Sequence, residues 1–266
     1  MSDDIHALGT IGPLDGRYRA DVAALAGYFS EAALFRYRVR VEVEYLIFLA
    51  RAPSVGFVPP LEPQQAAALR ALYRQFGDDD ALAIAAWDRK VNHDVKAVEY
   101  WLRERLDGLG LGRWKEAVHF ALTSEDVNNL AYGLMTREAR DLVILPAIAR
   151  LLERLRELAD AEADTPMLAR THGQPATPTT FGKELNVFFA RLRRASDAIL
   201  AVRLTGKLNG ATGTFAAQHA ALPHVDWMKF SKAFVRSLEL DPVLLTTQIE
   251  PHDSLAALCD AMKRAN

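Results

Sequence analysis

The sequence predicts an all-α protein, and three observations support this. The 266 residues include only 12 prolines and 15 glycines. The stretches between them are rich in Ala, Leu, Arg and Glu, which are strong helix formers. Within several of these stretches the apolar residues recur at spacings of three and four, which is the period of a helix. We therefore expect a small N-terminal helical domain followed by a bundle of long helices.

The first two expected helices lie on either side of a proline cluster. Ser30 is a good N-cap, and the helix that follows it should run to about Ala50. It should end before the cluster formed by Pro53, Pro59, Pro60 and Pro63. A second helix is predicted from Pro63, which suits a first helical turn, to Phe76, with Gly77 as its stop.

A third helix is expected to begin at Asn92, which can act as an N-cap. Its apolar residues fall on one helical face: Val95, Val98, Leu102 and Leu106. The glycine-rich run 107–112 then interrupts the helical pattern, so we place a domain boundary there. This gives an N-terminal helical domain over residues 1–112 and a central helical bundle over residues 113–266.

The central bundle is predicted to contain longer helices. Ser124 is an N-cap followed by two acidic residues, and no strong stop appears before Asp164. Pro146 should kink this helix without ending it, because the apolar stripe resumes on the same face. Two further helices are expected over residues 181–204 and 226–240. Helices of about forty residues favour an extended bundle, of the kind that can be shared between subunits.

A last helix should begin at Asp253 and is still in progress when the chain stops at Asn266. One interpretation is a short terminal helix, because Lys263 and Arg264 suit a C-terminal turn. The other, which we prefer, is that the sequence is interrupted inside a longer element.

Composition excludes several classes of partner. The net charge is −2, so the whole molecule has no electrostatic attraction to nucleic acid or to an anionic membrane. A single cysteine, Cys259, cannot form an internal disulfide, and no apolar run is long enough to span a membrane. His219 and His224 do not follow a metal-binding pattern. We expect a cytoplasmic protein with no metal and no organic cofactor.

The segment 165–179 lies between two strongly helical stretches and is long for a connection in a bundle. We expect it to be an irregular loop with a function. It carries His172, and the imidazole is the usual general acid or base because its ordinary pKa is near 6.5. The alternative, that His172 is a surface histidine in a turn, is equally compatible with the loop alone.

Two further clusters lie at expected helix starts, where free backbone N–H groups favour an anion. The first is Asn92, His93 and Asp94, and the second is Thr123 and Ser124. Simple capping of the helices explains both clusters as well, and for the first cluster it is the better explanation.

A third cluster lies near the N-terminus, where Arg17 and Tyr18 follow a glycine turn. Arginine is the natural partner of planar carboxylates and of phosphates. This pair therefore adds a candidate binding site for an anionic ligand.

In order along the chain, these clusters resemble a known family. The matching strings are PLDGRY (13–18), NHDVKAVEY (92–100), HFALTSEDVNNLA (119–131), RTHGQPATPTTFGKE (170–184), KLNGATG (207–213) and TQIEPHD (247–253). They resemble the bacterial-type adenylosuccinate lyases, which belong to the fumarase, aspartase and argininosuccinate lyase superfamily. The resemblance implies an all-α fold whose long bundle forms the core of a homotetramer, and a C-terminal helical domain that this chain lacks.

The resemblance also implies an activity in purine biosynthesis. The family eliminates fumarate from adenylosuccinate, giving AMP, and from the succinyl-aminoimidazole-carboxamide ribotide. By motif, His172 would be the general acid, and His93 would assist or orient the catalytic groups. The remaining matches would bind the nucleotide substrate: Arg17 and Tyr18 at the phosphate, Asn92, His93 and Asp94 at the nucleotide, Thr123 and Ser124 at the succinyl carboxylates, and Gln248 as a further contact.

One part of the family pattern is absent from residues 1–266. The family's signature loop, of the form Ser-Ser-x-Met-Pro-x-Lys-x-Asn-Pro, carries the serine that acts as general base, and no such string occurs. We therefore expect the 266 residues to be the N-terminal portion of a lyase and to be inactive alone. The alternative is a non-catalytic helical scaffold, or a nucleotide-binding fragment of the same superfamily.

Overall fold

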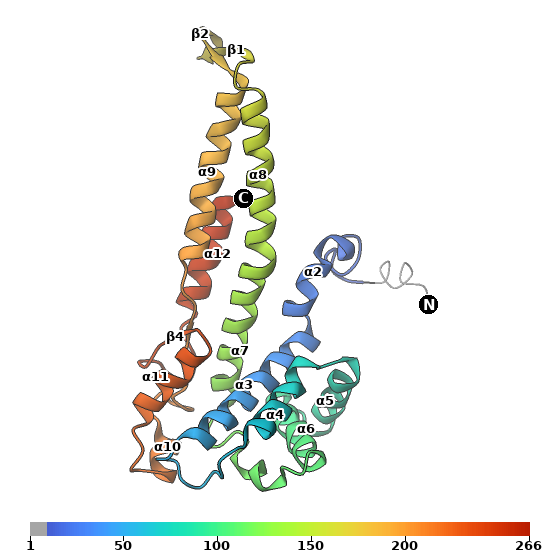
Figure 1. Cartoon of the computed structure of the whole chain (residues 1–266), viewed down its shortest axis with the longest axis vertical. Helices are drawn as coiled ribbons and strands as arrows, with labels where there is room; N and C mark the ends of the chain where they lie inside the picture. The colour runs from blue at the N-terminus through green and yellow to red at the C-terminus, as the bar shows by residue number, and fades with distance from the viewer. Residues whose placement is uncertain (1–9) are drawn as a thin grey trace. The chain divides into compact units, whose positions relative to one another are not determined.

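A computed structural model describes residues 10–266, and it confirms the all-α prediction (Figure 1). The only strands in the described part of the chain form two small sheets of two strands each. The chain divides into two compact units. Unit 1 comprises the described residues up to Arg137 together with Leu204–Pro251, and unit 2 comprises Glu138–Arg203 and His252–Asn266.

Unit 1 contains most of the shorter helices. Its helical elements are α2 (Arg19–Phe29), α3 (Glu31–Arg51), α4 (Pro63–Arg74), α5 (Asp78–Val91), α6 (Asp94–Gly108), the 3₁₀ turn η1 (Gly112–Ala117), α10 (Ala216–Ala221), α11 (Trp227–Ser237) and all but the last two residues of α7 (Ser124–Ala139). The predicted boundary at 107–112 lies inside this unit, and the division into domains stays a prediction.

Helix α3 runs through the core of unit 1. Ser30 caps it as predicted, because the Ser30 side chain accepts a hydrogen bond from the Ala33 backbone at 3.1 Å. Its aromatic residues meet those of α11 edge to face: the ring of Tyr45 lies 5.5 Å from that of Phe234, and the ring of Phe48 lies 5.0 Å from that of Phe230. These edge-to-face ring contacts fix α3 against α11.

The region before α6 differs from the prediction. Helix α5 was not predicted, and Asn92 ends it in a left-handed conformation, with φ of +52°. Asn92 is therefore not the N-cap of α6. That position belongs to His93, whose Nδ1 accepts the Lys96 backbone N–H at 3.2 Å. Asparagine tolerates positive φ well, which explains why it ends one helix here and does not begin the next.

The prediction that a helix continues past Pro146 is confirmed. Helix α7 leads into a π-helical segment, η2 (Arg140–Ile144), and then into α8 (Leu145–Ala161), with Pro146 in the first turn of α8. Proline has no N–H to donate and its ring crowds the preceding turn. A local π-helical segment widens that turn, so the helix can pass the proline.

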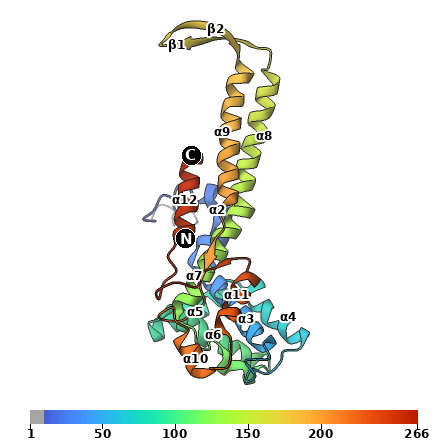
Figure 2. The same ribbon diagram turned by 90° about the vertical axis from the view of Figure 1, so that its left-hand side faces the viewer.

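Unit 2 is built on a pair of long helices. Helix α9 (Phe181–Ala201) packs along α8, and α12 (Asp253–Ala265) packs along α9 (Figures 1 and 2). At the far end of the pair the two backbones approach closely at Gly182. A Cβ there would lie 2.2 Å from the carbonyl oxygen of Ala159, so only glycine allows this approach.

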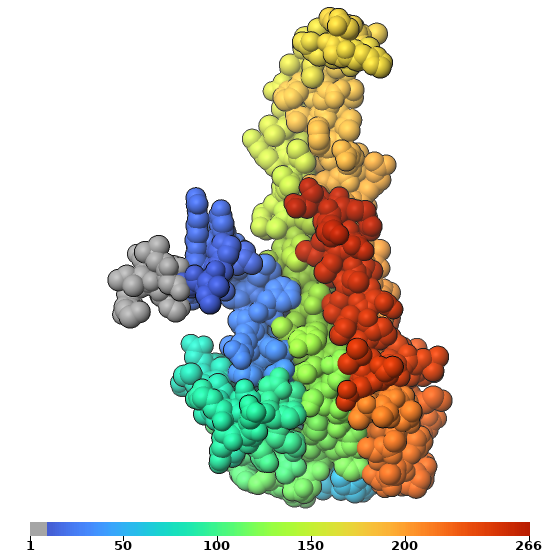
Figure 3. All heavy atoms as spheres, turned by 180° about the vertical axis from the view of Figure 1, so that it is seen from behind, coloured from blue at the N-terminus to red at the C-terminus, as the bar shows by residue number. Residues whose placement is uncertain are grey.

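The segment 165–179, expected to be an irregular loop, is mainly a β-hairpin. Strand β1 (Pro166–Thr171) pairs antiparallel with β2 (Gln174–Thr180). The turn residues His172 and Gly173 have φ of +48° and +76°, as in the tight turns that suit the twist of a hairpin. The hairpin projects from the end of the α8–α9 pair (Figure 3), and most of its residues are exposed.

The second sheet lies in unit 1, where β3 (Thr205–Gly206) runs parallel to β4 (Asp241–Pro242). Gly206 lies against α7, because a Cβ there would be 2.6 Å from a methyl group of Leu130. None of the described helices is both long and apolar enough for a membrane-crossing segment.

Candidate functional site

One stripe of helix α3 organises the predicted site residues of unit 1. Arg38, Glu42 and Tyr45 follow one another at spacings of four and three, so they share one helical face. All three side chains are buried. Each reaches a segment that carries or adjoins a predicted site residue, and α3 therefore holds these segments in fixed positions.

Arg38 connects the starts of two helices. Its Nη2 donates to Asp94 Oδ2 at 2.5 Å, at the start of α6. Its Nε donates to Asn128 Oδ1 at 2.8 Å, about one turn into α7. The predicted cluster at Asn92, His93 and Asp94 is thereby linked to the helix that begins beside Thr123. The same contacts show that Asp94 has a structural partner.

Glu42 holds His119, a residue that the sequence analysis did not select. The Glu42 carboxylate accepts the His119 backbone N–H at 3.1 Å and contacts its Nδ1 at 2.5 Å. Burial favours the neutral ring, but the charge and hydrogen bond of Glu42 outweigh burial, and the pKa of His119 is raised above its usual value. His119 lies four residues before Thr123 in the same matching string, and this position is the sequence signal that could have identified it.

Tyr45 completes the stripe by donating from its hydroxyl to the carbonyl oxygen of Phe120 at 2.9 Å. Burial raises the pKa of Tyr45 well above its usual value, so its hydroxyl stays protonated and continues to donate. The chain on either side of Phe120 adopts positive φ, at His119 (+58°) and Ala121 (+56°). Glu42 and Tyr45 thus hold an unusual backbone turn just before α7.

The start of α7 is capped internally, which bears on the role of Thr123 and Ser124. Asp126 Oδ2 accepts the Thr123 backbone N–H at 3.0 Å. The two hydroxyl residues are only partly exposed. Asp126 thereby fixes the Thr123 backbone at the start of α7, where the helix dipole and the first-turn N–H groups favour an anion.

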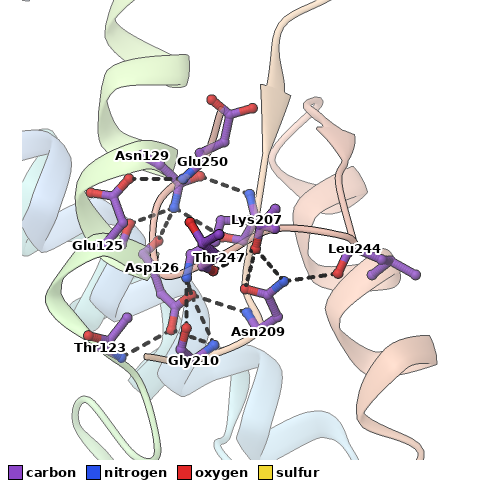
Figure 4. A network of polar contacts seen from close by, with 11 residues as sticks. Thr123, Glu125, Asp126, Asn129, Lys207, Asn209, Gly210, Leu244, Thr247 and Glu250 are labelled. Carbon is purple, nitrogen blue, oxygen red and sulfur yellow. Dashed lines mark hydrogen bonds and ion pairs between the residues drawn. The ribbon is translucent and has the colours of Figure 1, made fainter. Parts of the chain in front are cut away.

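Asp126 also anchors a distant segment of the chain (Figure 4). Lys207 Nζ lies 3.0 Å from Asp126 Oδ1, and both side chains are fully buried. The backbone N–H groups of Asn209 and Gly210 donate to the same carboxylate, at 3.1 Å each. Lys207 has a second partner in the Gly210 carbonyl oxygen, 2.8 Å away. Its buried charge is therefore well compensated.

The segment that carries Gln248 continues from this network. Gln248 is exposed, and Glu250, two residues later, is buried. Thr205 donates to Glu250 Oε1 at 2.7 Å, and the Glu250 backbone N–H donates to Glu125 Oε1 at 3.3 Å. Gln248 thus lies on a segment that a hydrogen bond joins to the first turn of α7. That turn is close in sequence to Thr123 and Ser124.

Two predicted residues stand apart from this arrangement. Arg17 and Tyr18 lie at the start of α2, are exposed, and stack on each other with the guanidinium 5.5 Å from the ring centroid. Within residues 10–266 no hydrogen bond or ion pair joins them to the other predicted site residues. Their role stays a prediction.

His172 belongs to unit 2, where it occupies the first turn position of the hairpin and is exposed. An exposed imidazole on a tight turn is suited to reach a ligand. A surface histidine without a catalytic role would be exposed in the same way, so exposure agrees with both interpretations. Across the described residues we find no group of three His, Cys, Asp or Glu side chains that would hold a metal ion.

Comparison with known proteins decides the family. The family model described as "Lyase" matches residues 16–266, which is nearly the whole chain. This chain belongs to the lyase family. The stretch matched by this lyase model includes every predicted site residue, from Arg17 to Gln248.

Within the lyases, the chain is most informatively compared with curated adenylosuccinate lyases. The chain is 44% identical over 264 residues to the adenylosuccinate lyase of Escherichia coli K12, covering 99% of this chain and 58% of that protein. It is 45% identical to that of Legionella pneumophila strain Corby, covering 98% and 57%, and 42% identical to that of Dictyostelium discoideum, covering 98% and 58%. The predicted resemblance is confirmed, and the chain spans a little over half the length of these relatives.

Solved structures support the same lyase fold. A fumarate lyase from Mesorhizobium sp. BNC1 matches with a TM-score of 0.68 and 23% identity, over 91% of this chain and 53% of that one. The 3-carboxy-cis,cis-muconate lactonizing enzyme from Pseudomonas putida matches with a TM-score of 0.67 and 23% identity, over 91% and 52%. At such identities the likeness concerns the fold alone.

Proposed function

We propose that this protein is a C–N lyase of purine biosynthesis that eliminates fumarate from adenylosuccinate and from the succinyl-aminoimidazole-carboxamide ribotide. The observation that carries the proposal is the 44% identity to adenylosuccinate lyases along 99% of the chain. We also propose that it acts in the cytoplasm. The activity is assigned to the full-length protein that the gene encodes, here called the intact gene product.

The substrate carries a phosphate and two succinyl carboxylates, and the proposed contacts suit these anions. Thr123 and Ser124 lie at the start of α7, where hydroxyls and the helix dipole favour a carboxylate. Asn92, His93 and Asp94 would contact the nucleotide at the start of α6, with His93 also assisting or orienting the catalytic groups, and Gln248 would add a further contact. Arg17 and Tyr18 would bind the phosphate.

The proposed reaction is a β-elimination. A base removes a proton from the succinyl carbon next to a carboxylate, and the electron pair of that C–H bond becomes the double bond of fumarate. The C–N bond breaks, and its electrons stay on the nitrogen. His172 would donate a proton to this leaving nitrogen as general acid. The two transfers balance, so no oxidant or cofactor is needed.

The base of this reaction is not assigned to any residue of unit 1 or unit 2. In the family that the chain resembles, a serine of the signature loop is the base, and no string of that form occurs in residues 1–266. We therefore expect residues 1–266 alone not to turn the substrate over.

We further propose that the intact gene product is a homotetramer built on α8 and α9. Large apolar side chains of these helices are exposed in unit 2, and clustered exposed apolar side chains often mark protein–protein contacts. They are Leu151, Leu158, Phe181, Val187, Phe188 and Leu200. Packing between copies would cover them, and it would let the hairpin that carries His172 contribute to a site shared between subunits.

Fumarate release from adenylosuccinate tests the function. We expect release by the intact gene product and none by residues 1–266. Turnover by residues 1–266 would contradict the assignment of the base to a loop outside them. A folded intact gene product that binds AMP and releases no fumarate would contradict the activity and favour a non-catalytic scaffold.

A further inference from the structure

The loop 207–213, which none of the proposed substrate contacts occupies, lies between the start of α7 and the segment that carries Gln248. Its first part is fixed to α7. Besides the buried ion pair of Lys207 with Asp126, the Lys207 backbone pairs with the amide of Asn129, donating at 2.8 Å and accepting at 3.1 Å. The loop therefore has a rigid base on the helix that carries Ser124.

The second part of this loop holds the chain before Gln248. The Asn209 side chain donates to the Leu244 carbonyl oxygen at 3.1 Å and to Thr246 Oγ1 at 2.8 Å. Asn209 is itself fully buried, so these hydrogen bonds form away from water and fix the position of Thr246 firmly.

Gly213 makes the closest approach to this segment. A Cβ at Gly213 would lie 2.2 Å from the Thr246 carbonyl oxygen and 2.8 Å from that of Thr247. Both contacts are with backbone, which cannot rotate aside as a side chain can. Any side chain at position 213 would push the Thr246–Thr247 backbone back by roughly 1 Å before ordinary van der Waals contact is restored.

We propose that Gly213 and Asn209 are positioning residues that set the backbone next to Gln248, and so fix the Gln248 side chain relative to Thr123 and Ser124. This rests on the proposed function, because Gln248 is a substrate contact only there. Gln248 is exposed and lies between two residues that hydrogen bonds fix, Thr246 before it and Glu250 after it. A shift of the backbone at Thr246 would therefore also move Gln248.

The main variant is Gly213→Ala in the intact gene product, with Gly110→Ala as its matched control. Both glycines have nearly the same positive φ, +71° and +70°, so alanine meets the same backbone strain at each. A Cβ at Gly110 would meet nothing within 4 Å. The difference between the two variants therefore reports the contact with Thr246 and Thr247, and not the cost of positive φ.

Steady-state kinetics with adenylosuccinate provides the first readout. We expect Gly213→Ala to lower kcat/KM by about 10²-fold, as for a displaced contact, and Gly110→Ala to leave it nearly unchanged. The decisive comparison adds Gln248→Ala. If Gly213 acts through Gln248, the double variant should be no worse than the worse single variant. Losses that multiply would show that Gly213 acts independently of Gln248 and would overturn the proposal.

Amide hydrogen exchange provides a readout that does not depend on activity. We expect faster exchange over residues 244–250 in Gly213→Ala than in Gly110→Ala, and unchanged exchange there would contradict the positioning role. If Gly213→Ala does not fold, Asn209→Ala removes the hydrogen bonds to Leu244 and Thr246 without a clash and should show the same coupling to Gln248. An intact wild-type protein without fumarate release would instead refute the proposed function, while the exchange comparison would still decide the positioning.

Discussion

At the scale of single residues, His172 is constrained by both backbone and proposed chemistry. Its φ of +48° disfavours most side chains, while asparagine is well tolerated there. The variant His172→Asn therefore removes the imidazole and keeps the hairpin turn, which His172→Ala would strain. This makes asparagine the cleaner probe of the general-acid role.

We predict that His172→Asn in the intact gene product lowers kcat by about 10²-fold or more and changes substrate affinity little, because proton donation matters mainly in the transition state. Steady-state kinetics and equilibrium binding measure the two effects. Met167→Ala, on the same exposed hairpin, serves as the control and should retain activity. A His172→Asn protein that binds poorly and turns over normally would rule out the acid role.

The His119–Glu42 pair predicts a pH dependence of stability. The pKa of His119 is raised in the folded protein by Glu42, so the pair adds stability below the unfolded pKa of about 6.5. That added stability is lost as the pH rises through the higher folded pKa. Glu42→Gln keeps an oxygen for the His119 backbone N–H and removes the charge.

Glu42→Gln should therefore reduce the free energy of unfolding by a few kcal/mol at pH 6 and by less at pH 8.5. Denaturant unfolding of wild type and variant at the two pH values measures this. A difference between the two proteins that is the same at both pH values would contradict the assignment of the raised pKa to Glu42.

At the scale of elements, the buried Lys207–Asp126 pair should dominate the stability of the loop 207–213. Lys207→Met leaves the Asp126 charge buried without its cation, and should cost about 3–5 kcal/mol in unfolding free energy. Lys115→Met is the matched control in the same unit, because Lys115 pairs with Asp107 where both side chains are partly exposed, and should cost less than about 1 kcal/mol. Equal effects in chemical denaturation would show that the buried ion pair drawn in Figure 4 contributes no more than an exposed one.

Sequence patterns predicted the helices whose first residues have the side chains typical of a helix start. Ser30 caps α3 as expected, because its side chain accepts the backbone N–H three residues later. Asp226, where the helix 226–240 was expected to begin, caps α11 in the same way. The hairpin was missed because Pro175 and Pro178 lie in β2 and argue against a strand. Its tight turn depends on positive φ at His172, a conformation that no sequence pattern indicated.

The candidate site was predicted by motif but not by contact. Asp94 and Thr123 were predicted from expected helix starts and from the matching strings, and Gln248 from its string alone. The structure adds the residues that join these segments of unit 1, which are Arg38, Glu42 and Asp126. These charged residues lie within helices, where sequence alone makes them look like ordinary surface residues. Their burial and partners depend on packing between elements that are distant in the chain, so no local pattern revealed them.

At the scale of the whole molecule, the exposed apolar faces of α8 and α9 lead to a prediction about assembly. We expect light scattering of the intact gene product to give a mass of four chains at micromolar concentration. Phe188→Glu places a charge on the exposed face and should shift the mass to smaller species, whereas Glu153→Lys, a charge change at a residue that is already exposed and charged, should not. A monomeric wild type would contradict the proposed tetramer.

The central claim is that this lyase-family chain takes part in releasing fumarate from a succinyl nucleotide. The most direct test incubates adenylosuccinate with the intact gene product and quantifies fumarate and AMP together. We expect both products to appear in equal amounts, and the His172→Asn protein to form them far more slowly. If a folded, intact wild-type protein leaves adenylosuccinate unconverted, the proposed function is wrong.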